Sequence, residues 1–255
     1  MSVVALCSAH GAPGTTTSAL ALCWAWPVAR PGRRVLLVDA DPAGSGLLTG
    51  YLSPGVPDAA GVSALAAGRL PVTAEQVVGC GVALDGAGTR MVLPGIADPV
   101  QARPLASMWQ SLLGAARDLS DSGIDVVVDV GRVGHRAEPR TWLAGADLVG
   151  VVVRGDLASV APAAAAVRGL AAERTGRLAA VAVLVDAAGY SPAQIGEALG
   201  VTHVLSLTRD PWTARALAAG GATGWRFERS PLHRAARAVV ERIDALAPDR
   251  TVVTR

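Results

Sequence analysis

The chain has 255 residues, of which 51% are hydrophobic and only 4% aromatic, so it is long enough to bury a core built mainly from aliphatic side chains. Its formal net charge of +2 excludes a protein whose whole surface is strongly basic, so any attraction to nucleic acid or an acidic membrane must be local. All 23 residues counted as lysine or arginine are arginine, so no ε-ammonium group is available anywhere in the chain.

Strands and helices are predicted to alternate along the chain. Nearly continuous apolar runs predict strands, and longer periodic segments between them predict helices. In chain order we expect a strand at 3–8, a helix at 15–29, strands at 33–40 and 89–95, a helix at 104–122, strands at 124–131 and 146–154, a helix at 157–173, a strand at 177–186, a helix at 191–199, a strand at 201–207, and helices at 211–219 and 231–246.

This alternation predicts an α/β fold, a three-layer, doubly wound and mostly parallel sheet with helices on both faces. The segment 43–88 is rich in Gly, Pro and Ala and is expected to be the least regular part. We expect one domain over residues 1–247 and a flexible C-terminal tail over 248–255.

The cysteine spacing and the apolar pattern of the chain indicate several features that we do not expect in this protein. Cys7, Cys23 and Cys80 are spaced neither for a disulfide framework nor for a metal cluster, so we expect no Fe–S cluster and no zinc. The N-terminal segment lacks the basic region and cleavage site of a signal peptide. No apolar run reaches the roughly 18 residues that a membrane span needs, so we expect no transmembrane segment and a cytoplasmic protein.

The first strand leads into a glycine turn and a helix, which is the arrangement of a phosphate-binding loop. In such a loop, backbone N–H groups hold phosphate oxygens, a lysine reaches the outer phosphates, and a Ser or Thr hydroxyl binds Mg²⁺. Thr16 falls at the magnesium position, whereas Thr15 occupies the lysine position. The predicted cofactor-binding residues of this loop are His10, Gly11, Ala12, Pro13, Gly14, Thr15, Thr16 and Thr17.

Acidic residues follow two of the predicted strands. Asp39 and Asp41 end the second strand and Asp129 ends the strand at 124–131. Carboxyl ends of adjacent parallel strands converge on one crevice, where these carboxylates are predicted to act in catalysis, with Thr16, Asp41 and Asp129 as Mg²⁺ ligands. The alternative is that the three aspartates only cap the turns that follow them.

These motifs resemble the ParA/MinD family of deviant Walker A P-loop ATPases, of the SIMIBI class. "HGAPGTTT" falls on the family's loop of the form Lys-Gly-Gly-x-Gly-Lys-Thr, and "DAD", "MVLPG", "DVVVD" and "ADLVGVVVRGDLASV" match later family segments in order. The resemblance covers essentially 1–247. It implies a P-loop NTPase fold, ATP and Mg²⁺ as cofactors, a face-to-face homodimer, and base contacts at Asp186, Arg209 and Asp210.

The chain departs from the family at both signature lysines, which are replaced by His10 and Thr15. The resemblance therefore implies a degenerate switch or scaffold, a pseudo-ATPase that binds ATP weakly and hydrolyses it slowly or not at all. Such a protein would organise partitioning, cell division or a secretion or pilus machine together with a protein partner.

Two alternatives stay open, an active ATPase in which arginine replaces the lysines and a metabolic ATP-dependent enzyme of the same superfamily. Arg132, Arg136 and Arg154 are candidate replacements, although each taken alone fits a solvated surface arginine better. The arginines of the last helix are interrupted by Glu241 and Asp244, so non-specific DNA binding is possible but not favoured.

Overall fold

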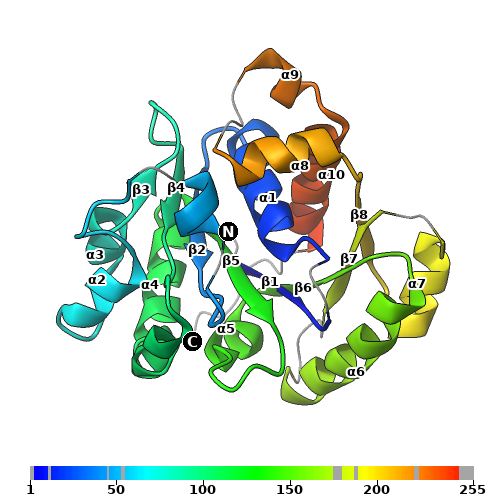
Figure 1. The fold of residues 1–255 in the computed structure, drawn as a ribbon, viewed down its shortest axis with the longest axis horizontal. Coiled ribbons are helices and arrows are strands. Elements are labelled where there is room, and N and C mark those ends of the chain that lie inside the picture. The colour runs from blue at the N-terminus through cyan, green and yellow to red at the C-terminus, as the bar shows by residue number, and fades with distance from the viewer. Residues whose placement is uncertain are drawn as a thin grey trace, which may run out of the picture.

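The computed structural model describes residues 3–10, 13–44, 46–52, 55–174, 180–186, 189–220 and 224–246. These residues form one eight-stranded sheet in the order β3-β4-β2-β5-β1-β6-β7-β8 (Figure 1). All neighbouring strands pair in parallel except β3, which is antiparallel to β4. The strands are β1 (Val3–Ser8), β2 (Arg34–Asp39), β3 (Val82–Ala83), β4 (Arg90–Leu93), β5 (Ile124–Arg132), β6 (Leu148–Val153), β7 (Val181–Val185) and β8 (Val204–Leu207).

Helices cover both faces of this sheet, so the predicted three-layer, doubly wound α/β fold is confirmed. One face packs against α1 (Thr15–Ala29), α8 (Pro211–Ala218), α9 (Trp225–Glu228) and α10 (Pro231–Leu246). The other packs against α2 (Gly61–Ala67), α3 (Ala74–Gly79), α4 (Trp109–Asp121), α5 (Arg140–Gly145), α6 (Leu157–Glu173) and α7 (Pro192–Leu199). A π-helical turn (Leu47–Tyr51) and two 3₁₀ turns (Pro99–Ala102 and Pro104–Ser107) complete the described elements.

Each predicted strand and helix is present, and the differences concern boundaries and short elements. The helix expected over 104–122 is divided, because Pro104 opens a 3₁₀ turn and α4 begins only at Trp109. The segment expected to be irregular contains α2, α3 and β3, and α3 begins with a capping box between Thr73 and Gln76. The predicted tail at 248–255 lies outside the described residues.

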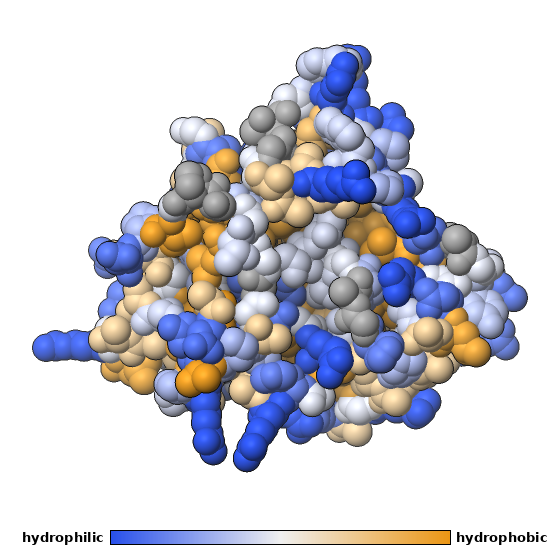
Figure 2. Space-filling model, viewed as in Figure 1, coloured by the Kyte–Doolittle hydropathy of each residue, from blue (hydrophilic) through white to orange (hydrophobic). Residues whose placement is uncertain are grey.

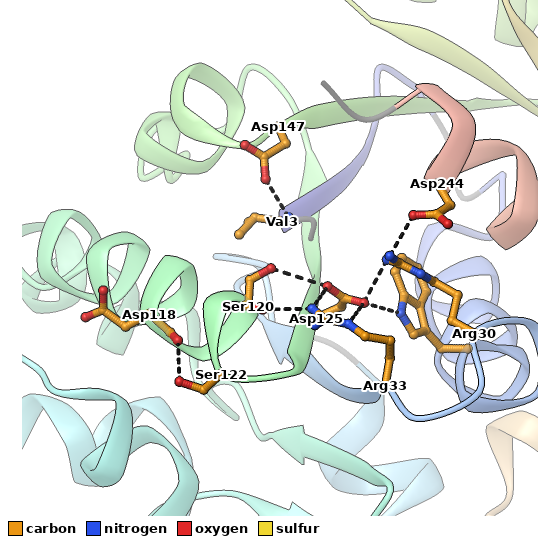
Figure 3. Close-up of polar contacts among 10 residues, drawn as sticks. Val3, Arg30, Arg33, Asp118, Ser120, Ser122, Asp125, Asp147 and Asp244 are labelled. Atoms are coloured by element: carbon orange, nitrogen blue, oxygen red, sulfur yellow. Dashed lines mark hydrogen bonds and ion pairs between the residues drawn. The ribbon is translucent and has the colours of Figure 1, made fainter. Parts of the chain in front are cut away.

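A buried carboxylate ties α1 to the sheet at the amino end of β5 (Figure 3). Asp125 is fully buried, and its Oδ2 accepts hydrogen bonds from Trp26 Nε1 at 2.9 Å and Arg30 Nη1 at 2.8 Å. Arg33 Nη2 lies 2.5 Å from its Oδ1, and Arg30 also pairs with Asp244 of α10 at 2.6 Å. Because a buried charge is tolerated only when it is paired and hydrogen-bonded, this network fixes α1, α10 and β5 relative to one another.

The surface mixes polar and apolar side chains, as the face shown in Figure 2 illustrates. The largest exposed rings are Trp212 and Trp225, which are 55% and 64% exposed. The guanidinium groups of Arg226 and Arg229 lie 5.5 Å and 5.9 Å from the Trp225 ring, within range of cation–π attraction. Among the described residues, no helix combines the length and the apolar character that a bilayer crossing requires.

Candidate functional site

The loop after β1 delivers the N-terminus of α1 to the carboxyl end of the sheet. Gly14 has φ +104°, a conformation that favours glycine, and α1 begins at the next residue without a side-chain cap. The first-turn N–H groups of a helix have no partner inside the helix, so this end can bind an anion. His10 is exposed in the same loop, and Pro13 is buried. Gly11 and Ala12 lie outside the described residues.

The predicted carboxylates come together at this end of the sheet. Asp39 and Asp129 are paired in register on the adjacent strands β2 and β5, and both are buried. The Asp41 N–H donates to Asp39 Oδ1 at 3.3 Å. The Asp41 carboxylate lies against Gly131, where an added Cβ would be 2.3 Å from Asp41 Cγ. Gly131, two residues after Asp129, therefore leaves the space that the Asp41 carboxylate occupies.

Thr16 and Asp129 connect the helix to the sheet. Thr16 Oγ1 donates a hydrogen bond to Asp129 Oδ2 at 2.6 Å, and the Gly131 N–H donates to Asp129 Oδ1 at 3.0 Å. Burial raises the pKa of Asp129 to about 6 in spite of these two bonds, and the Asp41 charge adds to the rise. Burial also raises the pKa of Asp41, although its bond from the Ala43 N–H opposes this. The site thus holds acidic oxygens whose charged form is disfavoured by burial, and such oxygens are suited to a hard divalent ion.

A cavity of about 320 Å³ lies between the helix terminus and these carboxylates. Thr15 is only 8% exposed, and its Oγ1 has no hydrogen-bond partner among the described residues. A buried hydroxyl without a partner is costly unless something absent from the protein chain completes it. The residues lining the cavity are Ser8, Gly14, Thr15, Thr16, Thr17, Asp41, Gly131 and Arg132.

These residues fit a nucleoside phosphate with Mg²⁺. Uncapped amides and the Thr15 hydroxyl are donors for phosphate oxygens, and Thr16, Asp41 and Asp129 offer oxygen ligands for the ion. Asp39 is not among the residues that line the cavity; it borders a separate void of about 10 Å³, the size of a single water. Asp41 also borders this void, whereas Asp129 lies behind Thr16 and lines neither space, so Asp41 is the carboxylate that faces the large cavity.

A second pocket of about 200 Å³ adjoins the first and shares Gly14 and Thr17 with it. Its walls include Val185 at the end of β7, Leu207 at the end of β8, and Leu232 of α10. These apolar residues were not singled out from the sequence, because strand-end and helix positions of this kind look like ordinary core. An apolar pocket beside a phosphate site is suited to a planar base.

The residues expected at the base occupy this second region. Asp186 follows β7 with φ +69°, and its Oδ2 lies 3.5 Å from Arg209 Nη1. Arg209 and Asp210 line the pocket. Asp210 also caps α8, since its carboxylate accepts from the Thr213 N–H at 3.1 Å and from Thr213 Oγ1 at 2.5 Å. In this structure Asp210 therefore caps α8, a function that is separate from the predicted contact with the base.

Three solved structures share this architecture. The cell division ATPase MinD of Pyrococcus furiosus aligns with a TM-score of 0.73 and 19% identity, over 97% of this chain and 100% of that one. A ParA family ATPase from Chlorobium tepidum gives 0.71 and 15%, over 94% and 98%. The septum site-determining protein MinD of Pyrococcus horikoshii, complexed with Mg-ADP, gives 0.64 and 16%, over 96% of each chain. No protein-family model matches the sequence, and no curated protein matches it either. At these identities the likeness is one of fold.

Proposed function

We propose, on the premise that this chain has the fold of the MinD and ParA ATPases, that it is a nucleotide-responsive switch that binds ATP with Mg²⁺. The observation that carries the proposal is the hydrogen bond of 2.6 Å from Thr16, which lines the cavity, to the buried carboxylate of Asp129 behind it. It joins a hydroxyl and a carboxylate from two elements, 113 positions apart in the sequence, so that the hydroxyl can serve an ion in the cavity while the carboxylate orients it.

Each part of the site has a distinct role in this proposal. The first-turn amides of α1 and the Thr15 hydroxyl bind phosphate oxygens, while Thr16, Asp41 and Asp129 hold the ion directly or through water. Within the described residues, no group of three or more His, Cys, Asp or Glu is arranged to hold a metal alone. Bound Mg²⁺ would therefore share its coordination with the phosphates, whose negative charge it neutralises. The base enters the pocket beside Asp186 and Arg209.

Hydrolysis is proposed to be slow or absent, because the chain contains no lysine. A cation on the developing charge of a transferred phosphoryl group is worth about 10³–10⁵ in rate. Binding suffers less, since one charge-assisted hydrogen bond contributes about 1.5–3 kcal/mol. We therefore propose a cytoplasmic homodimer held by protein contacts, which organises partitioning, cell division or a secretion or pilus machine together with a protein partner.

Calorimetry with ATP, in Mg²⁺ and in EDTA, tests the proposal. We expect magnesium-dependent binding that is weakened at least tenfold in Thr16→Ala, since the substitution removes an ion ligand worth about one charge-assisted hydrogen bond. Thr202→Ala, at an exposed threonine outside the site, serves as the matched control. Absence of binding in the wild-type protein, or equal binding in both variants, would refute the assignment.

Phosphate release and size measurements, with and without nucleotide, separate the remaining alternatives. Rapid turnover that is lost in Asp129→Ala would replace the slow switch with an active ATPase. A monomer in every nucleotide state would contradict the homodimer.

A further inference from the structure

The cavity of about 320 Å³ at the N-terminus of α1 has one cationic side chain in its wall, within the part of the chain that the structure describes. This residue is Arg132, the last residue of β5. Two walls of the cavity are formed by α1 amides and by Asp41. A nucleoside triphosphate would bring further negative charge beside that carboxylate, so the position of the cation decides how well the outer phosphates are held.

The backbone of β5 directs Arg132 to this place. The pairing between β1 and β5 shifts by one residue after Leu6, so that Cys7 lies opposite Gly131 and Ser8 opposite Arg132. Such a bulge turns the following side chains to a new direction. Gly131 has φ +74°, and the strand pairing continues as the Val133 N–H donates to Ser8 O at 2.8 Å. The bulge therefore sets Arg132 beside the N-terminus of α1.

The Arg132 side chain is exposed, and its guanidinium makes no hydrogen bond or ion pair with another described residue. Other arginines near this end of the sheet are already engaged or lie elsewhere. Arg154 Nε is 3.4 Å from Asp156, and Arg209 is 3.5 Å from Asp186. Arg136 is exposed and is not among the residues that line the cavity. Among the described arginines, Arg132 is therefore the one that both lines the cavity and has a guanidinium without a protein partner.

We propose that Arg132 binds the outer phosphates of the nucleotide and replaces, from the β5 side, the lysine that the loop lacks. This inference rests on the proposed nucleotide site and names its missing cation. A guanidinium presents a planar fork that matches two phosphate oxygens. It approaches from the strand rather than from the loop, so Thr15 remains a small hydroxyl beneath the phosphates.

Calorimetry with ATP, ADP and AMP in Mg²⁺ tests the role of this arginine. For Arg132→Ala we expect ATP and ADP affinities to fall about 10- to 100-fold, as for the loss of a charge-assisted hydrogen bond to an ion. AMP affinity changes little, because AMP lacks the outer phosphates. Arg132→Lys, which keeps the charge, retains more affinity than Arg132→Ala. Arg136→Ala is the matched control, an exposed arginine four residues away whose loss leaves all three affinities unchanged.

The outcomes distinguish this inference from the proposed function. If the wild-type protein binds ATP and Arg132→Ala binds it within twofold of wild type, the assignment of Arg132 is wrong and the nucleotide site stands. Equal losses of affinity in the Arg132 and Arg136 variants would also overturn it. Such a result would mean that the general positive charge of the surface, and not a direct contact from Arg132, causes the loss. If the wild-type protein binds none of the three nucleotides, the proposed function itself fails. Thermal melting of each variant verifies that it is folded.

Discussion

Removing the charge of Asp129 should make the nucleotide-free protein more stable. The side chain is fully buried, and burial together with Asp41 raises its pKa from an ordinary 3.8 to about 6. This difference corresponds to about 3 kcal/mol of unfolding free energy. Because the folded protein holds the proton more tightly than the unfolded chain, the stabilising contribution is complete below about pH 3.8. It is lost as the pH rises through about 6.

Asp129→Asn carries no charge at any of these pH values. We therefore expect its free energy of unfolding to be about 2–3 kcal/mol higher than that of the wild-type protein at pH 7 to 8. At pH 5 the difference should be about half that amount. Urea unfolding at the three pH values, without Mg²⁺ and nucleotide, measures the difference. Repeating it with ATP and Mg²⁺ should show that the variant has lost the stabilisation that the ligand gives to the wild-type protein.

Asp125→Asn is the matched control, because Asp125 lies on the same strand and is equally buried. Its carboxylate is paired with Arg30 and Arg33, so losing its charge should destabilise the protein by about 3–5 kcal/mol. Equal stability of wild type and Asp129→Asn at pH 8 would refute the reasoning. A gain that does not vary between pH 5 and pH 8 would show that packing, rather than charge, is responsible.

The remaining predictions concern the loop and the glycine beneath the site. Thr15→Lys restores an ammonium group to the loop and should tighten ATP binding about 10- to 100-fold relative to Thr15→Met, measured by calorimetry in Mg²⁺; equal affinities would contradict a phosphate contact at this position. Gly131→Ala should both destabilise the protein and weaken ATP binding, since the new Cβ meets the Asp41 carboxylate and the residue has φ +74°. Gly134→Ala, with φ +83° and no neighbour within 4 Å, should cost only the backbone strain, as thermal melting would verify.

The helices that the sequence failed to predict are short and lie where composition is uninformative. α2, α3, α5 and α9 each have seven residues or fewer, too short for a helical periodicity to stand out. Their formation depends on packing against the sheet and on local caps such as Thr73. The long strands and helices were predictable because each carries its own apolar pattern over a full element.

Within the candidate site, proximity was predictable and orientation was not. Strand ends of a parallel sheet converge, so the sequence indicated that Asp39, Asp41 and Asp129 would meet. It did not indicate that only Asp41 of the three would line the cavity, or that Asp210 would cap α8. Such details depend on where neighbouring side chains leave room, which no local pattern records.

The sequence by itself determined the alternation of strands and helices, the glycine turn before α1, the three acidic strand ends, and the complete lack of lysine, because these are properties of residue identity and spacing. The tertiary structure alone decided which cation faces the cavity at the N-terminus of α1, since that depends on a one-residue shift between β1 and β5 and on the space beside Gly131. A register shift arises from the packing of two strands that are far apart in the chain. The sequence of either strand alone therefore does not predict it.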